Sequence, residues 1–384
     1  MHKRYILAIG IATTLFASCK KEESTNLEKV PYSSLTTTTS YFNTFKGADN
    51  NSTVDFSGQT TRIKMMKELD AYMKTFTTTI LSAQKMKDMF ENKNSGFTDG
   101  SLNVATDKTI VSKTAQSFAT LDADAERQRF YGYFDSIAVA STYAGNTASQ
   151  GVSGLLDNKY LVNAKGFEYA QLVQKGLMGA MMLDQISNIY LGTEKQNADN
   201  NSIVTGKNYT QLEHHWDEAY GYLTSNEYYP KKDSAGTWLE SYLGSYVRQV
   251  NGTYGNPEAV YMAFLKGRAA IVNKDMKTRD EQIAIIRTSL EKAIATVAIS
   301  YLNKTKTATT DGAKFHALSE GIGFVYSLRF AHNAKFDKTK SNSLLDILMN
   351  KPDGFWSLTN GDLDNVRDQI ADAFGISREA IVNH

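Results

Sequence analysis

The chain has 384 residues, of which 41% are hydrophobic and 22% charged, and its 42 Lys and Arg balance 41 Asp and Glu. Nucleic-acid binding needs a basic stripe that neutralises phosphates, and the sequence has no run of basic residues, so nucleic acid is excluded as an expected partner. The only cysteine is Cys19, which excludes a disulfide within the chain.

The first nineteen residues have the pattern of a lipoprotein signal. Met1–Arg4 is positively charged, Tyr5–Phe16 is apolar, and two small residues precede Cys19. The apolar run is about a dozen residues, whereas a membrane-spanning helix needs about 20. Residues 15–19, Leu-Phe-Ala-Ser-Cys, resemble a lipobox. The Lys-Lys-Glu-Glu sequence that follows is similar to the export signal of surface lipoproteins in Bacteroidota.

We therefore expect a signal peptide over residues 1–18, then a lipidated Cys19 and a polar tether over residues 19–53, and a helical binding domain over residues 54–384. Ser, Thr and Asn are abundant in the expected tether. The lipid would be the membrane anchor of an outer-membrane lipoprotein at the cell surface, with the periplasmic face as the alternative. An ordinary secretory signal with a chance cysteine is the other interpretation.

Apolar residues recur at helical spacing along most of the remaining chain. This spacing predicts helices over residues 62–92, 122–143, 163–191, 210–223, 236–249, 257–273, 279–301, 313–333, 341–350 and 361–373. No segment alternates apolar and polar residues long enough to predict a sheet. The expected fold class is all-α, with antiparallel helix bundles arranged as two packed halves.

Two local patterns add detail to these helices. Thr210 and Glu213 have the spacing of a capping box, which predicts a helix that starts after Thr210. In the run Gly-Leu-Met-Gly-Ala at 176–180, the small residues Gly176, Gly179 and Ala180 have a spacing that lets a neighbouring backbone approach closely.

Histidines next to acids are the strongest chemical signal. His214 and His215 precede Glu218 by four and three residues, and His316 precedes Glu320 by four. On a helix this spacing directs an imidazole and a carboxylate at one spot. If the two helices pack side by side, the pairs could close a four-ligand site for zinc or iron. The other interpretation is that each carboxylate satisfies a buried histidine in a structural polar network.

A second polar set lies on the 163–191 segment. Glu168 and Lys175 are seven residues apart and share a helical face. We assign Glu168, Lys175 and Asp217 to a polar network that supports the histidines, with exposed charge as the alternative. His332 lies sixteen residues after His316, about 24 Å along one helix, so the two cannot share a mononuclear site.

Catalytic signatures are absent from the sequence. It has no His-Glu-x-x-His, no Glu-x-x-His, no Gly-x-Ser-x-Gly and no P-loop motif. We therefore assign no catalytic residue and leave open whether the protein is an enzyme, with non-enzymatic binding preferred.

Several stretches of the chain resemble a family of uncharacterised Bacteroidota helical lipoproteins. The matching sequences are Phe-Ser-Gly-Gln-Thr-Thr-Arg at 56–62, Gln-Lys-Gly-Leu-Met at 174–178, Glu-His-His-Trp-Asp-Glu-Ala at 213–219 and Phe-His-Ala-Leu-Ser-Glu at 315–320. This resemblance implies no activity that could be transferred.

The chain is also distantly similar to imelysin-like proteins, which are exported helical proteins linked to iron acquisition and once described as peptidases. Their signature is Gly-x-His-x-x-Glu. Here Lys314 stands at the glycine position, and Glu320 follows His316 by four residues. The resemblance implies a body of two helical bundles.

Together these observations predict a lipid-anchored binding protein of the cell envelope. It would capture iron, haem or another metal-bearing ligand for an outer-membrane transporter. The expected ligand-binding residues are His214, His215, Glu218, His316 and Glu320, and the candidate cofactors are iron, zinc and haem. The alternatives are an imelysin-like metallopeptidase and a surface lipoprotein that binds glycan or protein through its aromatic residues.

Overall fold

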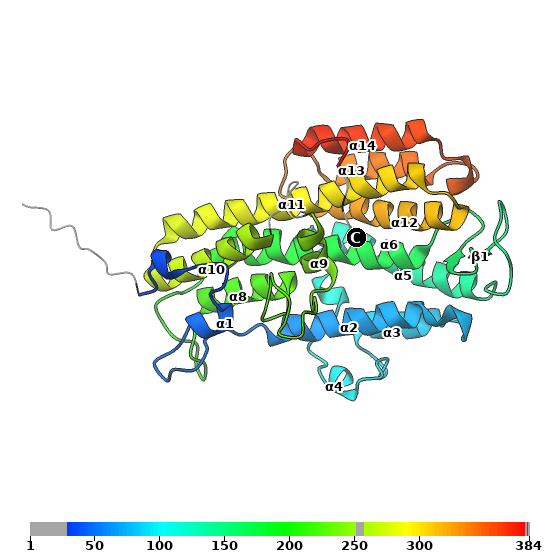
Figure 1. Cartoon of the computed structure of the whole chain (residues 1–384). Coiled ribbons are helices and arrows are strands. Elements are labelled where there is room, and N and C mark those ends of the chain that lie inside the picture. The colour runs from blue at the N-terminus through cyan, green and yellow to red at the C-terminus, as the bar shows by residue number, and fades with distance from the viewer. Residues whose placement is uncertain (1–28, 251–256, 381, 383–384) are drawn as a thin grey trace, which may run out of the picture.

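A computed structural model describes residues 29–250, 257–380 and 382. The expected signal peptide and Cys19 lie outside the described residues. The all-α fold class is confirmed, because helices make up the body and the described strands form one small hairpin (Figure 1). No helix in the described ranges is long and apolar enough to cross a membrane.

The α- and π-helices follow one another along the chain, and the longest connection runs from the end of α5 at Ser141 to the start of α6 at Tyr169. Their bounds are α1 Tyr41–Thr44, α2 Ser57–Met73, α3 Ala83–Glu91, α4 Gly100–Asn103, α5 Thr120–Ser141, α6 Tyr169–Leu177, η4 Met178–Leu183, η5 Gln185–Tyr190, α7 Thr193–Gln196, α8 Gln211–Leu223, α9 Tyr242–Gln249, α10 Pro257–Asn273, α11 Met276–Thr307, α12 Asp311–Ser327, α13 Lys338–Met349 and α14 Asn360–Phe374. The segments η4 and η5 are π-helical.

Short 3₁₀ turns and a hairpin complete the fold. The 3₁₀ turns are η1 Tyr32–Ser34, η2 Thr75–Thr77, η3 Val111–Lys113, η6 Leu328–Phe330 and η7 Gly354–Ser357. Strands β1 Gly154–Leu156 and β2 Tyr160–Val162 pair antiparallel. We did not predict this hairpin, because strands of three residues are too short to show alternation.

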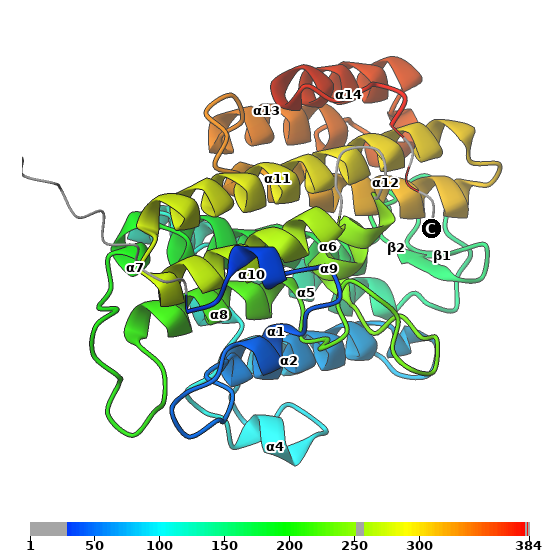
Figure 2. The same cartoon turned by 60° about the vertical axis from the view of Figure 1, so that its left-hand side comes forward.

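The helices are arranged in layers around α11, which has 32 residues and is therefore about 48 Å long. In both Figure 1 and Figure 2, α13 and α14 form one outer side, α11 and α12 lie next to them, and α2 lies towards the opposite side, where Figure 1 also labels α3. Buried side chains form one continuous hydrophobic cluster from Leu35 to Val382, so the helical layers share a single core. Trp216 lies in this core and donates its indole N–H to the carbonyl oxygen of Phe264.

The predicted helix over residues 62–92 is interrupted in the structure. α2 ends at Met73, and α3 begins only at Ala83, after the turn η2. Threonines fill much of the interval, and β-branched side chains lower helix propensity. The Ser82 side chain then accepts a hydrogen bond from the backbone N–H of Lys85, which caps the new helix.

Residues 29–53 pack against the helical body, in contrast to the polar tether that we expected there. Tyr41 and Phe45 are each 1% exposed. The Tyr41 hydroxyl donates to Asp217 at 2.8 Å, and the backbone N–H of Val30 donates to the side chain of Asn273 at 2.9 Å. The polar composition concealed these anchors, because a few buried aromatic residues are enough to fix a Ser- and Thr-rich segment.

Candidate functional site

The site is built on a close contact between two helical segments. One is α6 together with its continuation η4, and the other is α12. A Cβ atom added to Gly323 would overlap Lys175, and one added to Gly179 would overlap Ser327. Both contacts advance in the same direction along the chain, so these helical segments run parallel. The expectation that the 176–179 stretch permits close backbone approach is confirmed, and it lets polar side chains of the two helices meet.

Four of the residues that we singled out form one cluster between these helices. Nδ1 of His316 lies 2.6 Å from Oε2 of Glu168, and Nε2 of His316 lies 3.5 Å from Oε2 of Glu320. The other carboxylate oxygen of Glu320 lies 2.9 Å from Nζ of Lys175. We call these residues the α6–α12 cluster. Acidic and basic groups alternate along it, in the order Glu168, His316, Glu320 and Lys175.

The side chains of the α6–α12 cluster differ in how deeply they are buried. The side chains of Lys175 and Glu320 are 6% and 9% exposed, whereas that of His316 is 26% exposed. All four cluster residues line a cleft of about 500 Å³, together with the aromatic side chains of Phe76 and Tyr160. The imidazole of His316 is therefore the most accessible group of the cluster.

Tyrosines that the sequence did not single out support the cluster. The ring of Tyr160, from β2, stacks on His316 with centroids 4.5 Å apart. The Lys175 ammonium lies 5.4 Å from the ring centroid of Tyr246, whose hydroxyl is 3.2 Å from that of Tyr301. No local pattern marks these tyrosines, because they reach the cluster from separate elements.

The buried pair Lys175–Glu320 is ionised at neutral pH. Burial lowers the pKa of Lys175, but the Glu320 carboxylate and the hydroxyl of Tyr246 outweigh burial and raise this pKa. Burial likewise raises the pKa of Glu320, but Lys175 and His316 outweigh it, and the net pKa is lowered. The cluster thus holds a fixed ion pair behind His316.

The Glu168 carboxylate orients the imidazole of His316. A carboxylate accepts only, so Nδ1 carries the hydrogen in this contact, and in the neutral ring Nε2 then keeps a free electron pair. The Nε2 atom lies 3.5 Å from Oε2 of Glu320. Two ligands about 2.1 Å from one cation at roughly right angles are about 3 Å apart. With a small adjustment, the pair can therefore supply two adjacent ligands.

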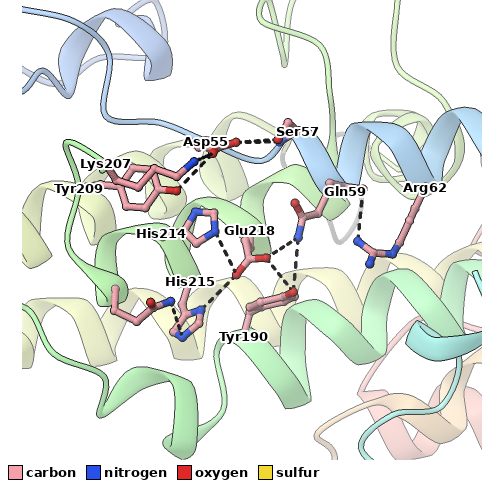
Figure 3. A network of polar contacts seen from close by, with 12 residues as sticks. Asp55, Ser57, Gln59, Arg62, Tyr190, Lys207, Tyr209, His214, His215 and Glu218 are labelled. Carbon is pink, nitrogen blue, oxygen red and sulfur yellow. Dashed lines mark hydrogen bonds and ion pairs between the residues drawn. The ribbon is translucent and has the colours of Figure 1, made fainter. Parts of the chain in front are cut away.

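The second predicted group, His214, His215 and Glu218, lies on α8 in a different network (Figure 3). The capping box of Thr210 and Glu213 is confirmed and fixes the start of this helix. Glu218 accepts from Nδ1 of His215 at 3.1 Å, and Nε2 of His214 lies 3.8 Å away.

Two further donors saturate the Glu218 carboxylate. Gln59, from α2, and the hydroxyl of Tyr190, from η5, each donate to it at 3.0 Å. Burial raises the pKa of Glu218, but the contacts with His215, His214, Gln59 and Tyr190 outweigh burial and lower it. The carboxylate therefore connects α2, η5 and α8, as the structural interpretation of these histidines requires.

Asp217 does not support either histidine group. It is fully buried on another side of α8, where its Oδ1 accepts from Nε of Arg268 at 3.0 Å and from the Tyr41 hydroxyl. Glu168 and Lys175, by contrast, lie where the supporting network was expected, next to His316 and Glu320.

The shared four-ligand site that we considered is not formed. α8 packs on α2, η5 and α10, whereas α12 packs on α6 and α11, so the two histidine pairs belong to networks with no common residue. Within the described residues, no group of three or more His, Cys, Asp and Glu side chains is arranged to hold a metal ion. Sequence spacing placed each pair on a helix but could not tell which helices face each other.

Comparison with known proteins gives one family match. The family model described as Domain of unknown function (DUF4856) matches residues 41–377. No curated protein and no solved structure matches the chain. The match begins at Tyr41, so it includes part of the N-terminal segment that packs on the body as well as the α6–α12 cluster.

Proposed function

The chain belongs to this family of unknown function, and from that premise we propose that it is a lipid-anchored binding protein of the cell envelope. Its ligand would bind in the cleft at the α6–α12 cluster. The proposed ligand carries a metal, as haem or an iron chelate does, and the proposed recipient is an outer-membrane transporter.

One observation carries the choice of ligand. Glu168 orients His316 so that Nε2 and the Glu320 carboxylate oxygen, 3.5 Å apart, border the cleft. Two protein ligands leave most positions around a metal unfilled, and a dedicated structural site usually supplies four. This favours a metal that arrives with donors of its own. The cleft volume of about 500 Å³ lies within the range of small-molecule sites.

The proposed location depends on the N-terminal sequence. A charged start, a short apolar run and Cys19 after small residues are the features of a lipoprotein signal. The similarity to Bacteroidota surface lipoproteins and to imelysin-like proteins agrees with this location and with a role in iron acquisition. Lipid on Cys19 would be the anchor.

Titration with ligands tests the binding proposal. Purified mature protein is titrated with haem, ferric citrate and zinc, followed by absorbance and calorimetry. We expect His316→Ala and Glu320→Gln to weaken binding of the preferred metal-bearing ligand at least tenfold. His332→Ala, which removes a histidine beyond the end of α12, should leave it unchanged. Equal, weak binding by the wild type and all variants would contradict the proposal.

The anchor is tested separately in cells. Full-length protein and Cys19→Ser are expressed with a labelled fatty acid, and membrane fractions are compared. We expect label and membrane association only with Cys19 present. If the unsubstituted protein carries no lipid, the proposed anchor is wrong, whatever the result of the titrations.

An exposed aromatic surface favours a second function, the capture of glycans. Trp238 and Tyr228 are 40% and 43% exposed, and Trp238 lines a pocket with Lys231 and Lys232. Aromatic faces with polar neighbours suit sugar rings. Binding of oligosaccharides that is lost in Trp238→Ala but kept in His316→Ala would favour this function over metal capture.

A further inference from the structure

A pocket unrelated to the α6–α12 cluster lies between the first half of α11 and the segment that follows η5. Its volume is about 330 Å³. Two arginines of α11, Arg279 and Arg287, form one wall, and the polar side chains of Thr193 and Asn197 contribute to the other. Ala284 lies between the arginines in sequence and also lines the pocket.

The charge of Arg287 is not neutralised by a neighbouring carboxylate. Its Nε and Nη2 donate to the carbonyl oxygens of Ser187 and Leu191, each at 2.9 Å, and these acceptors carry no net charge. In the described ranges, no Asp or Glu lies within 4.0 Å of this guanidinium. Buried or partly buried charges are normally paired, so the position calls for an anion.

The nearest acid along the helix compensates this charge poorly. Glu291, one turn further on α11, is buried, and burial raises its pKa to about 7. It is therefore only partly ionised at neutral pH. Burial also lowers the pKa of Arg287 itself, which is the direction expected for a cation without a close counter-ion.

The second arginine reinforces the positive wall. Nη1 of Arg279 donates to the carbonyl oxygen of Gln196 at 2.7 Å, and its Nη2 pairs with Asp280 at 2.7 Å. The Asp280 side chain is 62% exposed, so water screens its charge, whereas Arg279 is buried. The pocket thus offers two guanidiniums against one hydrated carboxylate.

We propose that this pocket binds a small oxyanion, a phosphate or carboxylate group, with Arg287 as its main electrostatic partner. Guanidinium groups present planar donors that match the oxygens of both anions. Thr193 and Asn197 also line the pocket, and their side chains carry a hydroxyl and an amide that can donate to the same anion. The phosphate has two sources with the same chemistry, free phosphate and the headgroup of an anionic lipid.

The test uses the mature chain in buffer without phosphate. Inorganic phosphate, sulfate and acetate are titrated by calorimetry at low and high salt. We expect saturable binding with one site, weaker at high salt. Ala284→Phe fills the pocket and keeps both arginines, and Arg287→Gln removes the charge and keeps an amide donor; each should weaken binding at least tenfold. Arg378→Gln, on the exposed surface beside Asp372, should not change it.

Vesicles distinguish the two sources. The same proteins are sedimented with phosphatidylcholine vesicles that contain or lack phosphatidylglycerol. If the protein sediments only with vesicles that contain phosphatidylglycerol, and Ala284→Phe and Arg287→Gln abolish this association, the ligand is a lipid headgroup. If the protein binds inorganic phosphate but no vesicles, the ligand is free phosphate. Thermal unfolding checks that each variant is folded. Absence of saturable binding by every anion, or unchanged affinity in folded Ala284→Phe, would overturn the proposal.

Discussion

Nδ1 of His316 lies 2.6 Å from Oε2 of Glu168, although 148 residues separate them in the chain. The contact exists because α6 and α12 run parallel and approach closely at Gly323. The orientation of the most accessible group in the cleft is therefore set by helix packing.

The Lys175–Glu320 pair should behave as a coupled unit. Lys175→Met leaves the Glu320 carboxylate buried without its ammonium, and we expect the free energy of unfolding to fall by about 3 kcal/mol. Glu320→Gln should cost a similar amount, and the double variant less than the sum of the two. Urea unfolding measures all three. The more accessible pair Lys306–Asp364, with side chains 21% and 41% exposed, is the control, and Lys306→Met should cost less than about 1 kcal/mol. Additive single effects would contradict the coupling.

Glu291 should make stability depend on pH. Burial raises its folded-state pKa to about 7, and the unfolded value is about 4.3. The folded state therefore binds the proton more tightly, and the stabilisation due to Glu291 is complete below about pH 4.3 and is lost as pH rises through about 7.

Glu291→Gln removes this titration and keeps an acceptor for the backbone N–H of His332. The free energy of unfolding of the variant, relative to that of the wild type, should rise by roughly 3 kcal/mol between pH 4.5 and pH 8. Denaturant unfolding at several pH values measures this difference. Glu281→Gln, at an exposed position of the same helix, is the control and should show no such trend. A constant difference between Glu291→Gln and the wild type across this range would show that Glu291 does not titrate as described.

The N-terminal segment should contribute to stability. A chain that starts at residue 54 lacks the buried side chains of Tyr41 and Phe45, each worth about 2 kcal/mol or more. It also removes the Tyr41 hydroxyl, which donates to Asp217, and the Thr53 hydroxyl, which accepts from Arg268, so the buried Asp217–Arg268 pair loses one partner on each side. We expect the free energy of unfolding to fall by at least about 4 kcal/mol relative to a chain that starts at residue 29. Equal unfolding midpoints would restore the tether interpretation.

Replacing two helical glycines by alanine should change the stability of the protein in opposite directions. A Cβ atom on Gly267 would overlap the ring of Trp216, so Gly267→Ala should destabilise the protein by about 2 kcal/mol. At Gly132 no atom lies within 4 Å of the added Cβ, and Gly132→Ala should stabilise α5 by up to about 1 kcal/mol. Thermal unfolding, together with the emission of the buried tryptophan, compares the two. A neutral Gly267→Ala would mean that the indole ring can move.

Helical periodicity predicted most of the fold, because long helices bury one face over many turns. The helix over residues 257–273 has the predicted bounds, and the capping box at Thr210 marks the start of α8. Periodicity could not predict features that extend over only a few residues. The break after Met73 depends on the Ser82 cap, and the β1–β2 hairpin depends on three-residue strands.

The candidate site was predictable only in its local part. His316 and Glu320 share a face of α12, so this pair could be recognised from spacing, whereas Glu168 directly precedes α6 and meets the cluster from the start of that helix. Which pairs meet depends on helix packing between distant segments. For the same reason, the sequence could not show that Glu218 is saturated by Gln59 and Tyr190.

The hydrogen bonds between Val30 and Asn273 fix where the chain leaves the helical body, close to the junction of α10 and α11. If Cys19 carries the proposed lipid, only nine residues, 20–28, connect it to the first described residue, Lys29. Ten peptide units extend at most about 35 Å, less than the length of α11. The domain would then stay close to the membrane that holds the lipid. It could contact receptors in that membrane, but it could not reach ligands far from the cell surface.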